Sequence, residues 1–201
     1  GGAQSPFYID DITLVAAPPP SQIQVTIDAN VVRRTVDSRL FGVAAAVWDG
    51  QFNTPATTSL LAANGTRVSR FPGGSLSDEY HWRTNTTRDN TWQWATGFDA
   101  FANVMRGVSA DAFITVNYGS ANAQEAADWV RYSNVTNSNG FHYWEVGNEN
   151  YGSWEYDLHT RPHDPYSYAL AYRDYKNAMK AVDSSIKVGA VVITGEDSYP
   201  N

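Results

Sequence analysis

The chain has 201 residues, a formal net charge of −7 at pH 7 and no cysteine. Its length suffices for one domain with a sizeable core, and its acidic balance argues against nucleic acid as a partner. The lack of cysteine excludes a disulfide framework, a thiol nucleophile and thiolate metal sites. Apolar runs are far shorter than the roughly 18–20 residues of a membrane span, so no membrane partner is expected. Aromatic residues form 13% of the chain, a number that suits stacking on sugars.

The first segment of the chain predicts a domain boundary. Residues 7–15 read as one β-strand, because β-branched and aromatic residues flank a pair of aspartates. Three consecutive prolines within residues 16–22 favour an extended spacer. The strand in residues 1–15 resembles the closing strand of a β-sandwich carbohydrate-binding module, and a strand added to the flank of the main domain is the alternative. The main domain is expected at residues 23–201.

Predicted strands and helices alternate through the main domain. Apolar runs predict buried strands at residues 40–47, 66–71, 111–117, 142–146 and 186–193, and a further short strand outside the sheet at 23–27. A helix is expected at residues 54–63, and apolar spacings of three and four predict others at 98–108, 123–130 and 168–182. This alternation predicts an α/β fold with a parallel sheet.

One strand end stands out by its chemistry. In a parallel βα array the ligand site lies beyond the carboxyl ends of the strands. Directly after the fourth predicted strand, Glu149 stands between Asn148 and Asn150, and none of the three is a turn requirement in the way that glycine is. We therefore expect Glu149 to be functional and Asn148 to bind a ligand; the alternative for Asn148 is a loop cap.

Several segments resemble one group of enzymes. Residues 143–152, which read YWEVGNENYG, resemble the fourth-strand motif of the clan of retaining glycoside hydrolases built on (β/α)8 barrels. Residues 70–74 (RFPGG) with 78–82 (DEYHW) are similar to the second-strand region of family 51, the α-L-arabinofuranosidases. Residues 117–119 (NYG) with 125–130 (EAADWV) fit the third βα unit of that family.

The resemblance implies roles for individual residues. Glu149 matches the general acid/base of the clan, and Asn148 matches the neighbour that bonds the sugar hydroxyl beside the anomeric carbon. A retaining hydrolase also needs a carboxylate nucleophile about 5–5.5 Å from the acid. In the clan this nucleophile follows the seventh strand, which would lie beyond Asn201. We therefore expect five βα units of a (β/α)8 TIM barrel, a second polypeptide piece that completes it, and no cofactor.

Two departures from family 51 concern the sugar pocket. The family places a sugar-binding glutamate at the end of the first strand, where this chain has Trp48 and then Asp49. Asp49 is a candidate replacement. The glycine pair is followed by Ser75 rather than by the more usual cysteine or asparagine.

Other polar and aromatic residues on strand-end loops are expected to form a cleft for the sugar. Each single aromatic ring has packing as its alternative, and a carboxylate such as Asp78 or Glu79 has an ordering role in its loop as its alternative. The expected substrate contacts, besides Asn148, are Trp48, Asp49, Glu79, Tyr80, Trp82, Asn117, Tyr118 and Trp154.

Two further groups of residues have a predicted non-catalytic status. Glu145 shares its strand face with Glu149, so it should point into the barrel, where an unpaired charge is costly. Arg70 on the second strand is its expected partner in a structural ion pair. The histidines and aspartate at 159, 163 and 164 match no standard metal spacing, so no metal is expected.

The resemblance implies a secreted enzyme that degrades plant cell-wall polysaccharide. Its leading substrate is the arabinofuranosyl side chains of hemicellulose. An endo-β-1,4-glucanase or xylanase on the same scaffold is the first alternative. A non-catalytic carbohydrate-binding protein on a decayed barrel is the second.

Overall fold

The computed structural model describes residues 25–28, 30–31, 33–45, 48–89 and 92–193. The chain divides into two units, Gly1–Thr35 and Val36–Asn201, whereas the main domain was expected to begin at residue 23. The strand and spacer predicted before residue 23 lie outside the described residues. The described residues of the first unit form no helix or strand, so the short strand expected at 23–27 is absent over 25–27. Val25 and Ile27 are exposed there, and no strand among the described residues pairs with them.

The described strands of the second unit form one parallel sheet in the order β1-β2-β3-β4-β5. The strands are β1 (Gly42–Ala44), β2 (Val68–Phe71), β3 (Asp111–Val116), β4 (Tyr143–Val146) and β5 (Lys187–Ala190). Successive strands are joined by α1 (Pro55–Ala63), α2 (Phe98–Val108), α3 (Ala123–Val130) and α4 (Pro165–Val182). Shorter helical segments are η1 (Ser38–Leu40), η2 (Ser75–Glu79) and η3 (Arg131–Thr136). The predicted parallel α/β fold with five strands is confirmed.

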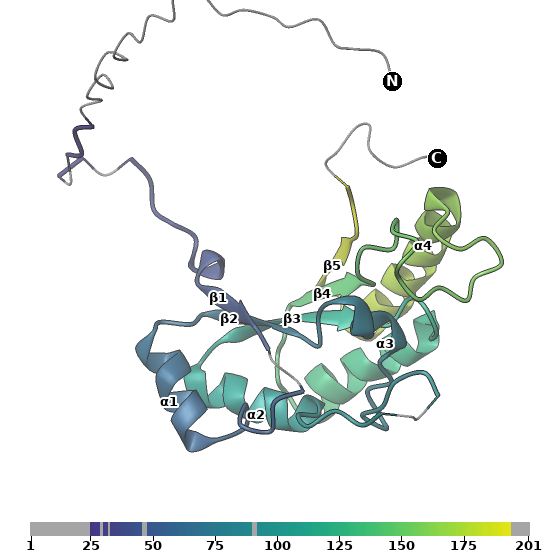
Figure 1. The fold of residues 1–201 in the computed structure, drawn as a ribbon, viewed down its shortest axis with the longest axis horizontal. Helices are drawn as coiled ribbons and strands as arrows, with labels where there is room; N and C mark the ends of the chain where they lie inside the picture. Colours follow the sequence, from purple (N-terminus) through teal and green to yellow (C-terminus); the bar gives the residue numbers. More distant parts are fainter. Residues whose placement is uncertain (1–24, 29, 32, 46–47, 90–91, 194–201) are drawn as a thin grey trace, which may run out of the picture. The chain divides into compact units, whose positions relative to one another are not determined.

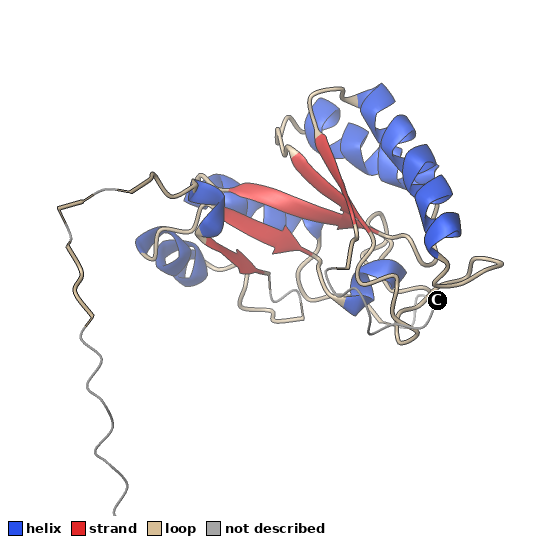
Figure 2. Ribbon diagram, turned by 90° about the horizontal axis from the view of Figure 1, so that it is seen from above, coloured by secondary structure: helices blue, strands red, loops and turns tan. Residues whose placement is uncertain are grey.

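The arrangement of the layers distinguishes between two kinds of parallel fold. The four long helices lie on one face of the sheet (Figures 1 and 2), and the strand order follows the chain without reversal. A doubly wound sheet would place helices on both faces and reverse its order at a switch point. Helices on one side of sequentially ordered strands are the pattern of a (β/α)8 barrel.

Local sequence determines where the helices begin. The side chains of Thr54, Asn122 and Asp164 each accept a hydrogen bond from a backbone N–H in the first turn of α1, α3 and α4. Pro165 occupies the first turn of α4, where no backbone donor is needed. Helix α4 therefore begins three residues before Tyr168, at its capping signal rather than at its first periodic apolar residue.

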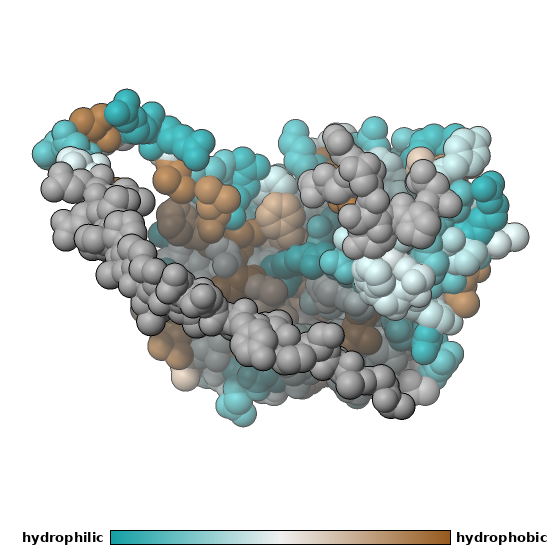
Figure 3. Space-filling model, turned by 45° about the horizontal axis from the view of Figure 1, so that its top comes forward, coloured by the Kyte–Doolittle hydropathy of each residue, from teal (hydrophilic) through white to brown (hydrophobic). Residues whose placement is uncertain are grey.

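The core lies between the sheet and the helices. Phe71 of β2 stacks on Phe101 of α2 with ring centroids 4.6 Å apart, and both are fully buried. The other face of the sheet is more polar, since Thr115 of β3 lies beside Glu145 of β4. Hydrophobic side chains also reach the surface of the molecule (Figure 3). At the two edges of the sheet they include Phe41, Val43, Val192 and Ile193.

Candidate active site

Glu149 lies at the carboxyl end of β4 in an unusual backbone conformation. Its φ is 44°, in the left-handed region that few non-glycine residues adopt. Such strained residues concentrate at functional sites, where the surrounding structure holds them in place. Gly147 precedes it with a φ of 76°, and a β-carbon there would collide with the side chain of Asn150. The turn therefore presents the exposed Glu149 side chain at the edge of the sheet.

The loop that follows folds back onto Glu149. The indole Nε1 of Trp154 donates a hydrogen bond to Glu149 Oε2 at 3.1 Å, and Gly152 N donates to the Glu149 carbonyl at 2.7 Å. The Trp154 ring is 56% exposed. One tryptophan thus orients a carboxylate oxygen of Glu149 and is itself partly exposed beside it.

Asn148 is buried, and charged partners fix its amide. Arg70 Nη2 donates to Asn148 Oδ1 at 3.0 Å, and Asn148 Nδ2 donates to Glu155 Oε1 at 3.0 Å. A guanidinium only donates and a carboxylate only accepts, so the oxygen and nitrogen ends of the amide are defined. These two hydrogen bonds to charged side chains are more than Asn148 would need as a loop cap.

The expected contact between Arg70 and Glu145 is present. Arg70 Nε donates to Glu145 Oε1, and Thr115 Oγ1 donates to the same oxygen at 2.6 Å. The two side chains of the pair are 34% and 26% exposed, so the pair is half-buried within the described part of the chain. Through Arg70 this pair connects the sheet to Asn148.

Asp78 holds the loops that follow β3 and β4 by hydrogen bonds. Its carboxylate is fully buried and accepts hydrogen bonds from Tyr118 N at 3.2 Å, Asn148 N at 3.0 Å and Asn150 Nδ2 at 3.1 Å. Burial raises the pKa of Asp78 to about 7, although these three donors favour the charged form. Of the two roles open from the sequence, the structure gives Asp78 the ordering role, because it has no exposed surface.

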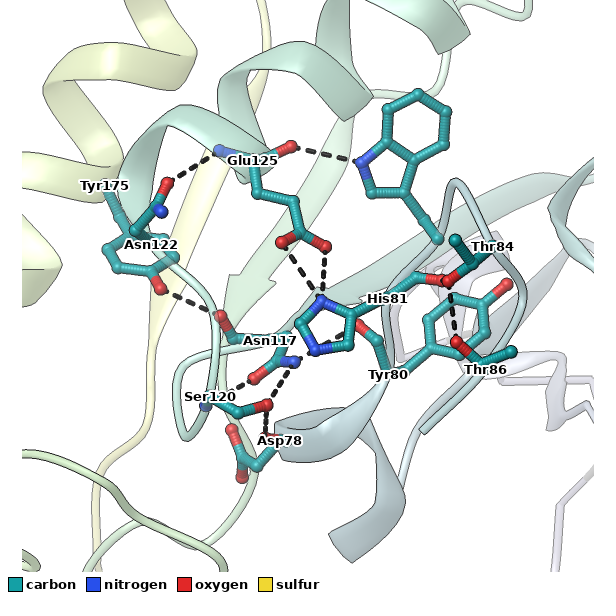
Figure 4. Close-up of polar contacts among 11 residues, drawn as sticks. Asp78, Tyr80, His81, Thr84, Thr86, Asn117, Ser120, Asn122, Glu125 and Tyr175 are labelled. Atoms are coloured by element: carbon teal, nitrogen blue, oxygen red, sulfur yellow. Dashed lines mark hydrogen bonds and ion pairs between the residues drawn. The ribbon is translucent and has the colours of Figure 1, made fainter. Parts of the chain in front are cut away.

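Asn117 and Tyr118 were predicted as substrate contacts, and both are buried in the described part of the chain. Asn117 is 4% exposed, and its side chain bonds Ser120 and the Tyr80 carbonyl (Figure 4). Tyr118 is 1% exposed and stacks on His159 at 4.2 Å. Both side chains connect the loop after β3 to its neighbours, and their contact with a sugar stays a prediction.

Tyr80 and Trp82 were also predicted as substrate contacts; both pack against other rings, and their contact with a sugar stays a prediction. Tyr80 packs edge-on against Phe71, and Trp82 stacks on Trp129 of α3 with centroids 6.0 Å apart. Trp82 Nε1 donates to the Glu125 carbonyl at 3.2 Å. The segment after η2 folds back over the helices, so its rings complete the core.

The other predicted substrate contacts are more accessible, and they also stay predictions. Trp48 is 62% exposed, and Asp49 is exposed with its carboxylate accepting from Gln51 N at 2.8 Å. Glu79 is partly buried and lies 3.5 Å from Arg88 Nε. These contacts leave Trp48 and Asp49 accessible to a sugar.

Two hollows of the surface lie away from Glu149 and are not lined by it. These hollows, of about 360 and 520 Å³, lie between the segment after η2 and the nearby helices. In the second, His81 Nδ1 is 3.0 Å from Glu125 Oε1 (Figure 4). Within the ranges described, no group of three His, Cys, Asp or Glu residues is placed to hold a metal ion. No helix in those ranges is long and apolar enough to cross a membrane.

Comparison with known proteins gives partial matches. No protein-family model matches the chain. A probable α-L-arabinofuranosidase C of Aspergillus terreus is 25% identical over 157 residues, which is 65% of this chain and 30% of that protein. An intracellular exo-α-L-arabinofuranosidase of Bacteroides ovatus is 29% identical over 150 residues, 59% of this chain and 27% of that protein.

A solved structure extends the likeness to the fold. The family 51 α-L-arabinofuranosidase of Bifidobacterium longum superposes with a TM-score of 0.64 at 22% identity, over 77% of this chain and 38% of that one. The chain spans about 30% of the length of the curated relatives it matches. The resemblance to α-L-arabinofuranosidases expected from the strand motifs is confirmed.

Proposed function

We propose that this chain carries the acid/base half of the active site of a retaining glycoside hydrolase. The observation that carries the proposal is the strained, exposed Glu149 beside an Asn148 whose amide is oriented by charges on both sides. The similarity to α-L-arabinofuranosidases supports arabinofuranosyl side chains of hemicellulose as the substrate. A polysaccharide or oligosaccharide is then the partner of this site.

The residues present account for one side of the reaction. Glu149 would protonate the leaving oxygen while a second carboxylate attacks the anomeric carbon, and would then take a proton from the water that releases the sugar. Asn148 keeps one amide N–H beyond its bond to Glu155, and this donor would bond the hydroxyl next to the reacting carbon.

The nucleophile and the closing strands of the barrel would come from residues beyond the five described strands. A barrel needs eight strands, and the described part of the chain supplies five. Exposed hydrophobic side chains at both edges of the sheet support this arrangement, because further strands would cover them. We also propose that the protein acts outside the cell.

Substrate assays on the complete protein test the proposal. We expect release of arabinose from an aryl α-L-arabinofuranoside and from arabinoxylan, with the first-formed product keeping its anomeric configuration by NMR. Shortening of xylan or glucan chains without arabinose release would replace it with the endo-acting alternative. Binding of these sugars without any turnover would leave a carbohydrate-binding protein.

A further inference from the structure

A buried carboxylate lies behind Asn148 and takes no part in the proposed reaction. Glu155 is 4% exposed, and its Oε1 accepts hydrogen bonds from Asn148 Nδ2 at 3.0 Å and Ser75 Oγ at 2.9 Å. Its Oε2 has no hydrogen-bond partner within the described part of the chain. Burying a carboxylate with an unpartnered oxygen is unfavourable, so packing alone does not explain a glutamate here.

Glu155 is the end of a connected series of charged and polar groups. Glu145 bonds Arg70, Arg70 bonds the oxygen end of the Asn148 amide, and Glu155 bonds the nitrogen end. The two ends of an asparagine amide have nearly the same shape, so packing does not distinguish them. A flipped Asn148 would place its oxygen against the Glu155 carboxylate and its NH₂ group against the Arg70 guanidinium, and both contacts are repulsive.

Trp154, which precedes Glu155, contacts Glu149, which follows Asn148. Trp154 donates to Glu149, while Glu155 accepts from Asn148. Glu155 N also donates to the Gly152 carbonyl at 3.0 Å, which closes the loop between the two pairs. Two consecutive residues therefore hold two consecutive side chains of the site.

We propose that Glu155 is a positioning residue that fixes which end of the Asn148 amide faces the bound sugar. This inference rests on the proposed function and specifies how that site is oriented. With Glu155 in place, Asn148 presents its remaining N–H to the sugar hydroxyl. Without it, only the bond from Arg70 opposes rotation of the amide. A rotated amide presents a lone pair, and the donor is then lost when charge develops in the transition state.

Kinetics of the complete protein on an aryl α-L-arabinofuranoside test the inference. We expect Glu155→Ala to lower kcat roughly 10- to 100-fold with a smaller change in KM, as for loss of a hydrogen bond to a charged group. Glu155→Gln keeps an acceptor oxygen and should restore most of the rate. In an Asn148→Ala background, Glu155→Ala should have no further effect on kcat, because its partner is already gone.

Asp183→Ala serves as the matched control. Asp183 is also a carboxylate with several partners, accepting from Asn134 Nδ2 at 2.9 Å and Ser185 N at 3.0 Å, but it lies at the end of α4 and does not touch Asn148. We expect it to lower the melting temperature and to leave kcat unchanged. Equal losses of kcat from Glu155→Ala with and without Asn148 would overturn the positioning role, as would an unchanged kcat in Glu155→Ala.

A second readout separates this inference from the proposed function. If the complete wild-type protein hydrolyses no arabinofuranoside, the proposed function has failed. The side-chain NH₂ signals of Asn148, assigned by their loss in Asn148→Ala, then report the orientation directly by ¹⁵N NMR. We expect them to shift in Glu155→Ala, to stay in place in Asp183→Ala and to move little in Glu155→Gln. Signals unmoved in Glu155→Ala would contradict the inference.

Discussion

The two faces of the sheet differ in how completely the described residues cover them. On the helix side, Phe71, Phe101 and Trp144 are almost fully buried and form a continuous apolar core. On the other side, Arg70 and Glu145 keep about a third and a quarter of their side-chain surface exposed. The covered face stabilises the fold, and the open face and adjoining strand ends hold the polar groups of the site. Changes in the apolar core should therefore act mainly on stability, and changes at the strand ends mainly on activity.

The largest expected effect is on activity, at the strand ends. Glu149→Gln in the complete protein removes the acid while keeping an acceptor for Trp154. We expect a loss of about 10²- to 10⁴-fold in kcat/KM on arabinoxylan. The loss should be smaller on aryl glycosides, whose leaving groups need little protonation. Parallel rate assays on both substrates measure it, and equal, modest losses on both would remove Glu149 from the acid role.

The covered face predicts the opposite pattern. Phe101 is fully buried and stacks on Phe71, so Phe101→Ala leaves a cavity in the core. We expect the free energy of unfolding to fall by about 3–5 kcal/mol, with kcat unchanged at temperatures where the variant stays folded. Denaturant unfolding and rate assays measure the two quantities. A large loss of kcat with normal stability would break the division between the faces.

The ion pair between Arg70 and Glu145 tests whether the open face is covered in the complete protein. If further strands enclose the pair, Glu145→Ala leaves Arg70 as an uncompensated buried charge and should lower the free energy of unfolding by about 3–5 kcal/mol. A pair as exposed as in the described residues would contribute only about 1 kcal/mol. We expect the larger value, measured by denaturant unfolding of the complete protein. The smaller value would argue against a closed barrel.

Hydrophobic periodicity and resemblance together predicted the parts of the molecule that local sequence determines. The five strands follow from apolar runs, the helices largely from spacings of three and four, and the Arg70–Glu145 contact from strand alternation. The start of α4 was missed by three residues, because its capping Asp164 precedes the periodic pattern.

The division of the aromatic residues could not be predicted. Trp82 and Trp154 are the same residue type on loops at the same edge of the sheet, yet Trp82 is 7% exposed and Trp154 is 56% exposed. Trp82 is buried because the segment after η2 folds back onto Trp129, a contact between residues far apart in the chain. Glu155 gave no local signal either, since its role depends on Ser75 and Asn148 reaching it from two loops.

The smallest expected effect is a pH-dependent one, in the segment after η2 that also carries the buried rings of Tyr80 and Trp82. His81 bonds Glu125 of α3, and this hydrogen bond raises the pKa of His81 above its usual 6.5 despite partial burial (Figure 4). A group whose pKa is raised in the folded state stabilises the protein fully below its unfolded pKa. That stability is lost as the pH rises through the folded pKa.

We therefore expect the wild-type protein to lose stability through His81 as the pH rises from 6.5 through the raised pKa of the folded state. His81→Gln should remove this part of the pH dependence, and Glu125→Gln should do the same from the other partner. Asp78 provides a slope of the same sign that survives both changes. Its pKa is raised from 3.8 to about 7, so the stability that the neutral carboxyl contributes is lost as the pH rises between these two values. Unfolding curves between pH 5 and 9 separate the two contributions. If the stability of His81→Gln depends on pH as strongly as that of the wild-type protein, the hydrogen bond between His81 and Glu125 is not charged.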